Sequence, residues 1–67
     1  MNSAKKLGEN MKKIRLAKGM TQGDICRKLE VDRAYISNIE SGNKNPTLST
    51  ITNLAKALGV SIDELLK

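Results

Sequence analysis

Four side chains near the middle of the chain have the types and the spacing that reading the edges of DNA bases requires. On a helix that advances about 100° per residue, Arg33, Ala34, Ser37 and Asn38 fall on one side. Arg donates two hydrogen bonds to guanine O6 and N7, Asn pairs in the same way with adenine, Ser bonds to a base or a phosphate, and the Ala methyl suits a thymine methyl. We therefore predict that residues 33–41 form a helix that enters the major groove.

The alternative is that these residues form an ordinary solvated helix face. A solvated face usually carries more Lys and Glu, because those residues favour the helix more than Ser or Asn do. Here the face has a single charge, at Arg33, and otherwise short side chains that let a helix backbone approach a partner closely. Tyr35, at the edge of this face, is expected to lie half in the core, with its hydroxyl reaching a phosphate or a flanking base.

A second short helix is expected directly before this one. Thr21 followed by Asp24 gives a capping-box-like start, with Asp in place of the usual Glu or Gln. The turn that follows should direct Val31 into the core, and the Asp32 carboxylate should cap the next helix. Residues 21–42 are therefore predicted to form two helices joined by a short turn, a helix-turn-helix.

Helical periodicity continues through the rest of the chain, and no alternating strand pattern is present. One helix is expected over residues 4–18, another before Gly59, and a short last one over 61–67. Gly8 should weaken the first helix slightly. We therefore predict one compact all-α domain of five helices over residues 1–67. The apolar residues expected to face its core include Leu7, Met11, Ile14 and Ala17 in the first helix, and Leu48, Ile51, Leu54, Ala55 and Leu58 in the fourth.

The chain is basic, and its charge is unevenly distributed. Twelve Lys and Arg against seven Asp and Glu give a formal net charge of +5. Residues 1–33 hold nine of the basic and four of the acidic groups. This basic excess flanks the predicted groove-facing helix, where it could attract nucleic-acid phosphates. The alternative is that these residues are ordinary solvated lysines.

Catalysis finds little support in the residue types. There is no His, no nucleophile–base pair, no metal-ligand cluster and no Gly-rich phosphate loop, so we expect no enzymatic activity, no cofactor and no metal. Cys26 is expected to be a small buried apolar group, and a redox switch there is the alternative. The absence of an apolar run of about 18 residues, of a signal peptide and of a cysteine pair predicts a cytoplasmic protein.

Four segments of the chain follow the order and spacing of a known family. They are IRLAKGMTQ at 14–22, DRAYISNIESG at 32–42, NPTLSTITNLAKALGVS at 45–61 and DELL at 63–66. Together they resemble the lambda-repressor-like helix-turn-helix family, the phage repressor and Cro type also called XRE. The resemblance implies sequence-specific DNA binding by a fold in which helices two and three form the helix-turn-helix. Within the family, DRAYISNIE is similar to the recognition helix of controller proteins of restriction–modification systems.

The resemblance also implies roles for residues around the predicted recognition helix. Arg15 and Glu40 correspond to an Arg of helix one and a Glu of helix three that form an ion pair in the family. Glu30 stands where the family commonly has Gly with positive φ, which for Glu would cost on the order of 1 kcal/mol. The family clamps DNA phosphates at the start of helix two and in the loop after helix three, at positions that correspond to Thr21, Gln22, Asn43, Lys44 and Asn45.

The last helix is the expected self-association element. A two-fold homodimer would place two recognition helices roughly 34 Å apart on a pseudo-palindromic operator. We therefore expect a DNA-binding transcriptional regulator that acts as a homodimer on double-stranded DNA, with no membrane partner. The alternative is an antitoxin-like or partner-docking protein-interaction module. The residues expected at the dimer interface are Val60, Ile62, Leu65 and Leu66.

Overall fold

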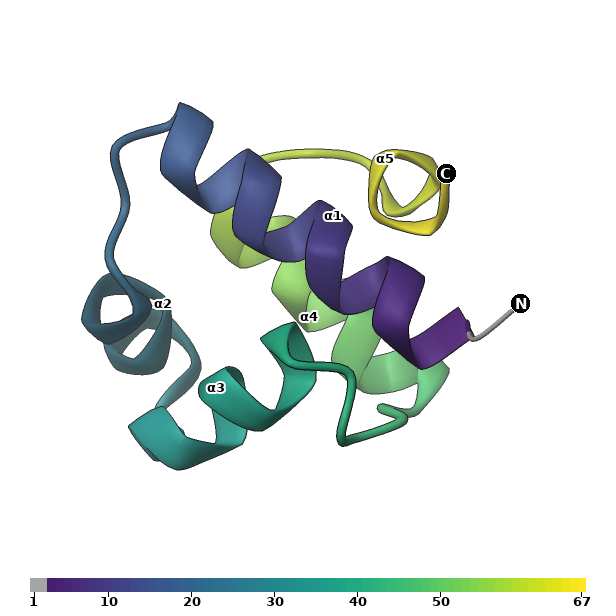
Figure 1. The fold of residues 1–67 in the computed structure, drawn as a ribbon. Coiled ribbons are helices and arrows are strands. Elements are labelled where there is room, and N and C mark those ends of the chain that lie inside the picture. Colours follow the sequence, from purple (N-terminus) through teal and green to yellow (C-terminus); the bar gives the residue numbers. More distant parts are fainter. Residues whose placement is uncertain (1–2) are drawn as a thin grey trace.

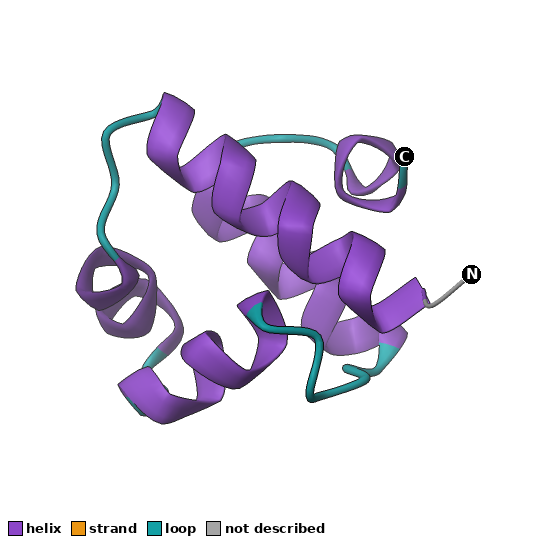
Figure 2. Ribbon diagram, viewed as in Figure 1, coloured by secondary structure: helices purple, strands orange, loops and turns teal. Residues whose placement is uncertain are grey.

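Five α-helices follow one another in the computed structural model, which describes residues 3–67 (Figure 1). Figure 2 shows only helices and loops over these described residues, so the all-α prediction is confirmed. No helix over residues 3–67 is long and apolar enough to cross a membrane. The helices are α1 (Ser3–Ala17), α2 (Gln22–Leu29), α3 (Arg33–Glu40), α4 (Leu48–Leu58) and α5 (Ile62–Leu66).

Local capping interactions set the starts of α2 and α3 in different ways. The Thr21 hydroxyl accepts a hydrogen bond from the Asp24 N–H (3.1 Å), and the Asp24 carboxylate accepts one from the Thr21 N–H (2.8 Å). This reciprocal capping box satisfies two backbone donors at the start of α2. Asp32 occupies the N-cap position of α3, but its side chain makes no capping hydrogen bond, so that expectation is wrong. The Tyr35 N–H donates to the Asp32 backbone carbonyl instead (3.0 Å), and the exposed carboxylate stays in contact with solvent.

An aliphatic core joins all five helices. α1 lies between α3 and α5, while α4 contacts α2 and α5 (Figure 1). Burying one large aliphatic side chain contributes roughly 1.5–3 kcal/mol. Every helix supplies at least one such side chain, so the core fixes the relative positions of all of them. The largest fully buried side chains are Met11, Ile25, Ile36, Ile39, Leu54, Leu58 and Leu65.

Two residues expected to face the core are exposed, and others, among them Cys26, are only partly covered. Leu48 has 67% of its surface exposed, and Ala17 is exposed as well. Leu48 is the first residue of α4 and Ala17 is the last residue of α1, so both lie beyond the packed middle of their helices. Cys26 is half-buried rather than buried. Periodicity assigns a residue to one side of a helix but does not say how far along the helix the packing extends.

Gly8, expected only to weaken α1, has a packing role. A Cβ at this position would lie 2.3 Å from the carbonyl oxygen of Ile39 and 2.6 Å from that of Glu40. The α1 backbone therefore approaches the last turn of α3 more closely than any side chain would permit. This contact fixes the position of α3 relative to α1.

The turn between α2 and α3 contains a left-handed residue. Glu30 has φ 57° and ψ 46°, and it is the only non-glycine residue with positive φ among residues 3–67. The Val31 N–H then donates to the Cys26 carbonyl at 3.2 Å, which closes the end of α2. Val31 is half-buried and packs against the core, as expected. The chain thus keeps Glu in a backbone conformation that costs on the order of 1 kcal/mol.

Candidate nucleic-acid interface

The outer face of α3 carries the four side chains expected to contact bases. Arg33, Ala34, Ser37 and Asn38 are all exposed. The two isoleucines on the opposite side of α3 are fully buried. The core therefore holds α3 in one rotational position, with this polar face turned to solvent.

Two segments expected to contact phosphates border α3. Figure 1 shows α2 and the loop that follows α3 on opposite sides of α3. Gln22, the first residue of α2, donates from Nε2 to Glu40 Oε1 at 3.1 Å. The Asn43 N–H donates to the Asn38 carbonyl at 3.0 Å, so each segment is tied to α3 by a hydrogen bond. The exposed residues in the two segments are Thr21, Asn43, Lys44 and Asn45, while Gln22 is half-buried.

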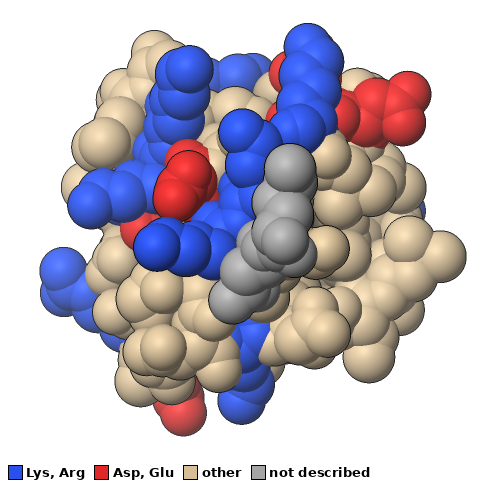
Figure 3. Space-filling model, turned by 45° about the vertical axis from the view of Figure 1, so that its right-hand side comes forward, with Lys and Arg blue, Asp and Glu red and all other residues tan. Residues whose placement is uncertain are grey.

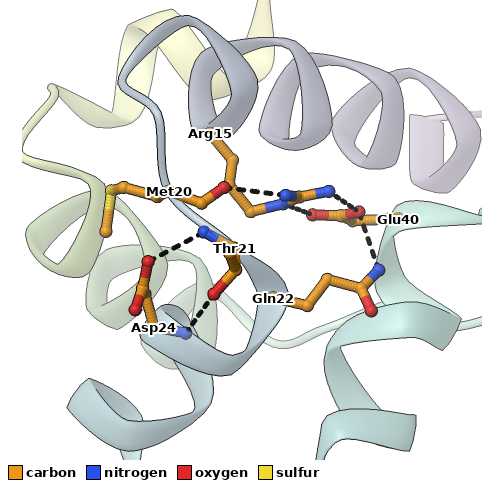
Figure 4. A network of polar contacts seen from close by, with 6 residues as sticks. All are labelled: Arg15, Met20, Thr21, Gln22, Asp24 and Glu40. Atoms are coloured by element: carbon orange, nitrogen blue, oxygen red, sulfur yellow. Dashed lines mark hydrogen bonds and ion pairs between the residues drawn. The ribbon is translucent and has the colours of Figure 1, made fainter.

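A buried ion pair connects α1 to the end of α3 (Figure 4). Arg15 Nε donates to Glu40 Oε2 at 2.7 Å, and Arg15 Nη2 donates to Glu40 Oε1 at 3.0 Å. The remaining guanidinium nitrogen, Nη1, donates to the Met20 carbonyl at 2.9 Å. Because Gln22 donates to the same Glu40 Oε1, the network joins α1, the start of α2 and the end of α3. The pairing implied by the family resemblance is present.

Because this ion pair is buried, losing one partner should cost more stability than losing a surface salt bridge would. Arg15 is 7% exposed and Glu40 is 9% exposed. The hydrogen bond to Glu40 is the main cause of a raised pKa for Arg15, and it outweighs the lowering effect of burial. Removing either partner would leave the other charge buried and uncompensated, which typically costs about 3–5 kcal/mol.

Asp24 places a negative charge close to the expected phosphate contact at the start of α2. Arg27 forms an ion pair with Asp24, which reduces the repulsion that an approaching anion would meet. The Thr21 N–H is the main cause of a lowered pKa for Asp24, and Arg27 lowers it further. Arg27 was not among the residues predicted from the sequence, although a spacing of three residues on a helix is a known signal for an ion pair.

Tyr35 and Lys44 contact each other, a feature absent from the sequence predictions. Lys44 Nζ lies 5.2 Å from the centroid of the Tyr35 ring, within the range of about 6 Å that a cation–π interaction requires. Tyr35 is half-buried, as expected, and Lys44 is exposed. The loop conformation that brings them together has no signature in the residue pattern.

The lysines of α1 do not all border α3. Figure 3 shows a face of the molecule on which Lys and Arg side chains predominate over acidic ones. Lys6, Lys13 and Lys67 line a groove between α1 and α5, on the side of α1 away from α3 (Figure 1). Lys5, by contrast, lies beside the end of α3, since a Cβ at Gly42 would be 3.0 Å from its Cα. Only part of the basic excess of α1 is therefore near the candidate interface.

The residues expected at a self-association interface differ in exposure. Leu65 is fully buried in the chain's own core, so the expectation that it contacts a second copy is wrong. Val60 and Ile62 are half-buried and pack against the same core, while Leu66 is 51% exposed. A helix of five residues is too short for periodicity to separate a buried leucine from an exposed one. On α5, Leu66 is thus the main source of exposed apolar surface.

Comparison with known proteins finds relatives over nearly the whole chain. The sequence model of a helix-turn-helix family matches residues 11–65. An uncharacterised HTH-type transcriptional regulator, y4dJ of Sinorhizobium fredii, is 40% identical over 65 residues, which span 97% of this chain and 84% of that protein.

Two solved structures are similar in fold as well as in sequence. The restriction-modification controller protein C.AhdI from Aeromonas hydrophila aligns with a TM-score of 0.89 and 32% identity, over 97% of this chain and 98% of that one. The restriction-modification controller protein C.Esp1396I, solved as a tetramer in complex with its natural 35 base-pair operator, aligns with a TM-score of 0.84 and 40% identity. That alignment covers 100% of this chain and 99% of the other.

Proposed function

The chain belongs to the lambda-repressor-like (XRE) helix-turn-helix family of transcriptional regulators, and on this premise we propose that it binds a specific sequence of double-stranded DNA and regulates transcription. In this proposal α3 enters the major groove. The observation that carries it is the exposed polar face of α3, on a helix that a buried ion pair and a glycine contact hold firmly against α1. A helix held in this way presents its side chains to base edges in a fixed register, which recognition requires.

Four exposed residues of α3 are the proposed base contacts. Arg33 would donate two hydrogen bonds to a guanine, and Asn38 would pair with an adenine. Ala34 would contact a thymine methyl, and Ser37 would bond to a base or a phosphate. Each well-formed bidentate contact discriminates against the wrong base by about 1–3 kcal/mol, so Arg33 and Asn38 would supply most of the sequence preference.

Residues on both sides of α3 are the proposed backbone contacts. At the start of α2, Thr21, Gln22 and the first backbone N–H groups would face a phosphate, because helix N-termini favour anions. Gln22 uses one amide hydrogen for Glu40, which leaves the second for a phosphate. Across α3, the loop at 43–45 would hold another phosphate, with the Tyr35 hydroxyl beside it. These contacts would set the register of the protein on the duplex rather than its sequence preference.

We further propose that DNA is bound by a homodimer with recognition helices roughly 34 Å apart, on a pseudo-palindromic operator. The tetramer that the related C.Esp1396I forms on its operator supports self-association. Within residues 60–67, the exposed Leu66 and the half-buried Val60 and Ile62 are the proposed contact. Sedimentation at tens of micromolar should show a dimer for the wild type and a monomer for Leu66→Lys. A wild type that stays monomeric even with a duplex of two half-sites would contradict this arrangement.

Similarity to two restriction-modification controller proteins, together with the segment DRAYISNIE, supports a controller-type regulator within the family. We propose a cytoplasmic location and action by binding rather than by catalysis. Residues 1–67 would act as one DNA-binding unit, with 21–42 as its helix-turn-helix.

Selection of bound duplexes from a random pool tests the proposal. Enrichment of a pseudo-palindrome with half-sites about one helical turn apart is the expected result. No enrichment above background at moderate salt would contradict sequence-specific binding. That result would favour an antitoxin-like or partner-docking role instead.

A further inference from the structure

The loop between α3 and α4 is attached to α3 by few polar contacts. Backbone hydrogen bonds from the Gly42 N–H to Ile39 O (3.1 Å) and from the Asn43 N–H to Asn38 O (3.0 Å) end just before Lys44. In the part of the chain that the structure describes, no hydrogen bond or ion pair joins residues 44–46 to α3. The Lys44 ammonium group reaches back to α3 through its contact with the Tyr35 ring.

A protein can hold a cation with a carboxylate or with an aromatic ring, and the two have different consequences. A carboxylate would neutralise the cation, whereas a ring attracts it through its quadrupole and adds no net charge. Lys44 Nζ lies 5.2 Å from the Tyr35 ring centroid, and among residues 3–67 it has no acidic partner. We infer that the Tyr35 ring is a neutral support that positions the Lys44 ammonium for a DNA phosphate while leaving its charge intact.

This inference rests on the proposed DNA binding and goes beyond it, because it makes Tyr35 a positioning residue for Lys44. An unsupported Lys side chain loses much rotamer freedom when it binds a phosphate. Here the ring restricts the side chain before DNA arrives, so less freedom is lost on binding. The expected gain is the strength of an exposed cation–π contact, a factor of about two to five in affinity.

A double-mutant cycle on DNA affinity tests the coupling between the two side chains. Lys44→Met keeps most of the stem and removes the charge, and Tyr35→Leu keeps an apolar side chain and removes the ring. Lys44→Met lowers the affinity for a selected duplex by some factor in the wild type. In the Tyr35→Leu background, this factor should be about two to five times smaller. Equal fold losses in the two backgrounds would overturn the positioning role.

Tyr35→Phe is the matched control, because it removes the hydroxyl and keeps the ring. In the Tyr35→Phe background, Lys44→Met should weaken DNA binding by the same factor as it does in the wild type. A loss as small as that in Tyr35→Leu would mean that the hydroxyl, and not the ring, couples Tyr35 to Lys44, and the inference would then be wrong.

Proton NMR of the uncomplexed protein adds a readout that does not depend on DNA. The protons on Cε of Lys44 should be shifted upfield by the Tyr35 ring, with the shift retained in Tyr35→Phe and lost in Tyr35→Leu. If Tyr35→Leu does not fold, the wild type and Tyr35→Phe still decide the matter, since the absence of an upfield shift in both would overturn the contact. A shift without any duplex binding would overturn the proposed function and the positioning role with it. Binding without coupling would overturn the positioning role alone.

Discussion

Gly8 of α1 and Ile39 of α3 are in backbone contact, because a Cβ at Gly8 would lie 2.3 Å from the Ile39 carbonyl oxygen. The next residue of α3, Glu40, forms the ion pair with Arg15 of α1 at 2.7 Å. A backbone contact and a buried ion pair therefore act side by side on the last turn of α3. Together they make α1 the element that orients the polar face of α3.

Gly8→Ala should lower the free energy of unfolding by about 1–3 kcal/mol, because the added methyl group overpacks the contact with α3. The loss should occur although Ala favours a helix by up to about 1 kcal/mol over Gly. Gly23→Ala is the matched control, since a Cβ there would meet no atom closer than 3.5 Å, and it should leave stability unchanged or raise it. Urea unfolding of both variants measures the difference. Equal stabilisation by the two substitutions would contradict the packing role of Gly8.

Glu30→Gly should raise the free energy of unfolding by about 1 kcal/mol, because Gly adopts the left-handed conformation of this turn without a Cβ clash. In a domain of this size, that gain corresponds to a rise of roughly 4–8 °C in Tm. Glu30→Ala serves as the control, since it removes the carboxylate and keeps the strain. The prediction fails if Gly and Ala give the same Tm.

Glu40→Ala should destabilise the fold by about 3–5 kcal/mol, because it leaves the Arg15 guanidinium buried without its carboxylate. Arg27→Ala, which breaks the exposed ion pair with Asp24, should have a much smaller effect. Thermal unfolding followed by circular dichroism compares the two. A Tm for Glu40→Ala within error of the wild type would show that the ion pair does not support α3.

The capping box at the start of α2 predicts a particular pH dependence. Hydrogen bonding from Thr21 and the charge of Arg27 hold the pKa of Asp24 below its ordinary value of 3.8. A carboxyl with a lowered folded-state pKa stabilises the fold above its unfolded pKa and loses that effect as the pH falls through the folded one. The stability difference between wild type and Asp24→Asn should therefore be constant above about pH 5 and shrink below about pH 4. A difference that grows on acidification would contradict this interpretation.

Helix positions and several caps could be predicted from the sequence, because they depend on local periodicity and on residues three or four apart. The capping box of Thr21 with Asp24 is of this kind, whereas the strain at Glu30 followed from the family resemblance. The Arg15–Glu40 pair, which joins residues 25 apart, followed only from the family resemblance. Local pattern alone gave no reason to connect them.

Features that depend on packing between distant segments could not be predicted. The sequence predicts only a slight weakening of α1 at Gly8, because the carbonyl groups that lie against Gly8 belong to the distant α3. The burial of Leu65 and the exposure of Leu66 depend on how a one-turn helix docks, which no periodicity records. The contact of Lys44 with Tyr35 depends on the path of an irregular loop.

Binding affinity of wild type and Arg33→Ala for a selected operator and for a scrambled duplex of equal length tests sequence reading most directly. Arg33→Ala should lose about 1–3 kcal/mol on the operator and little on the scrambled duplex. Lys44→Met, measured in parallel, should weaken both duplexes similarly and make the salt dependence shallower. Equal losses on the two duplexes for Arg33→Ala would contradict a base-reading role for α3.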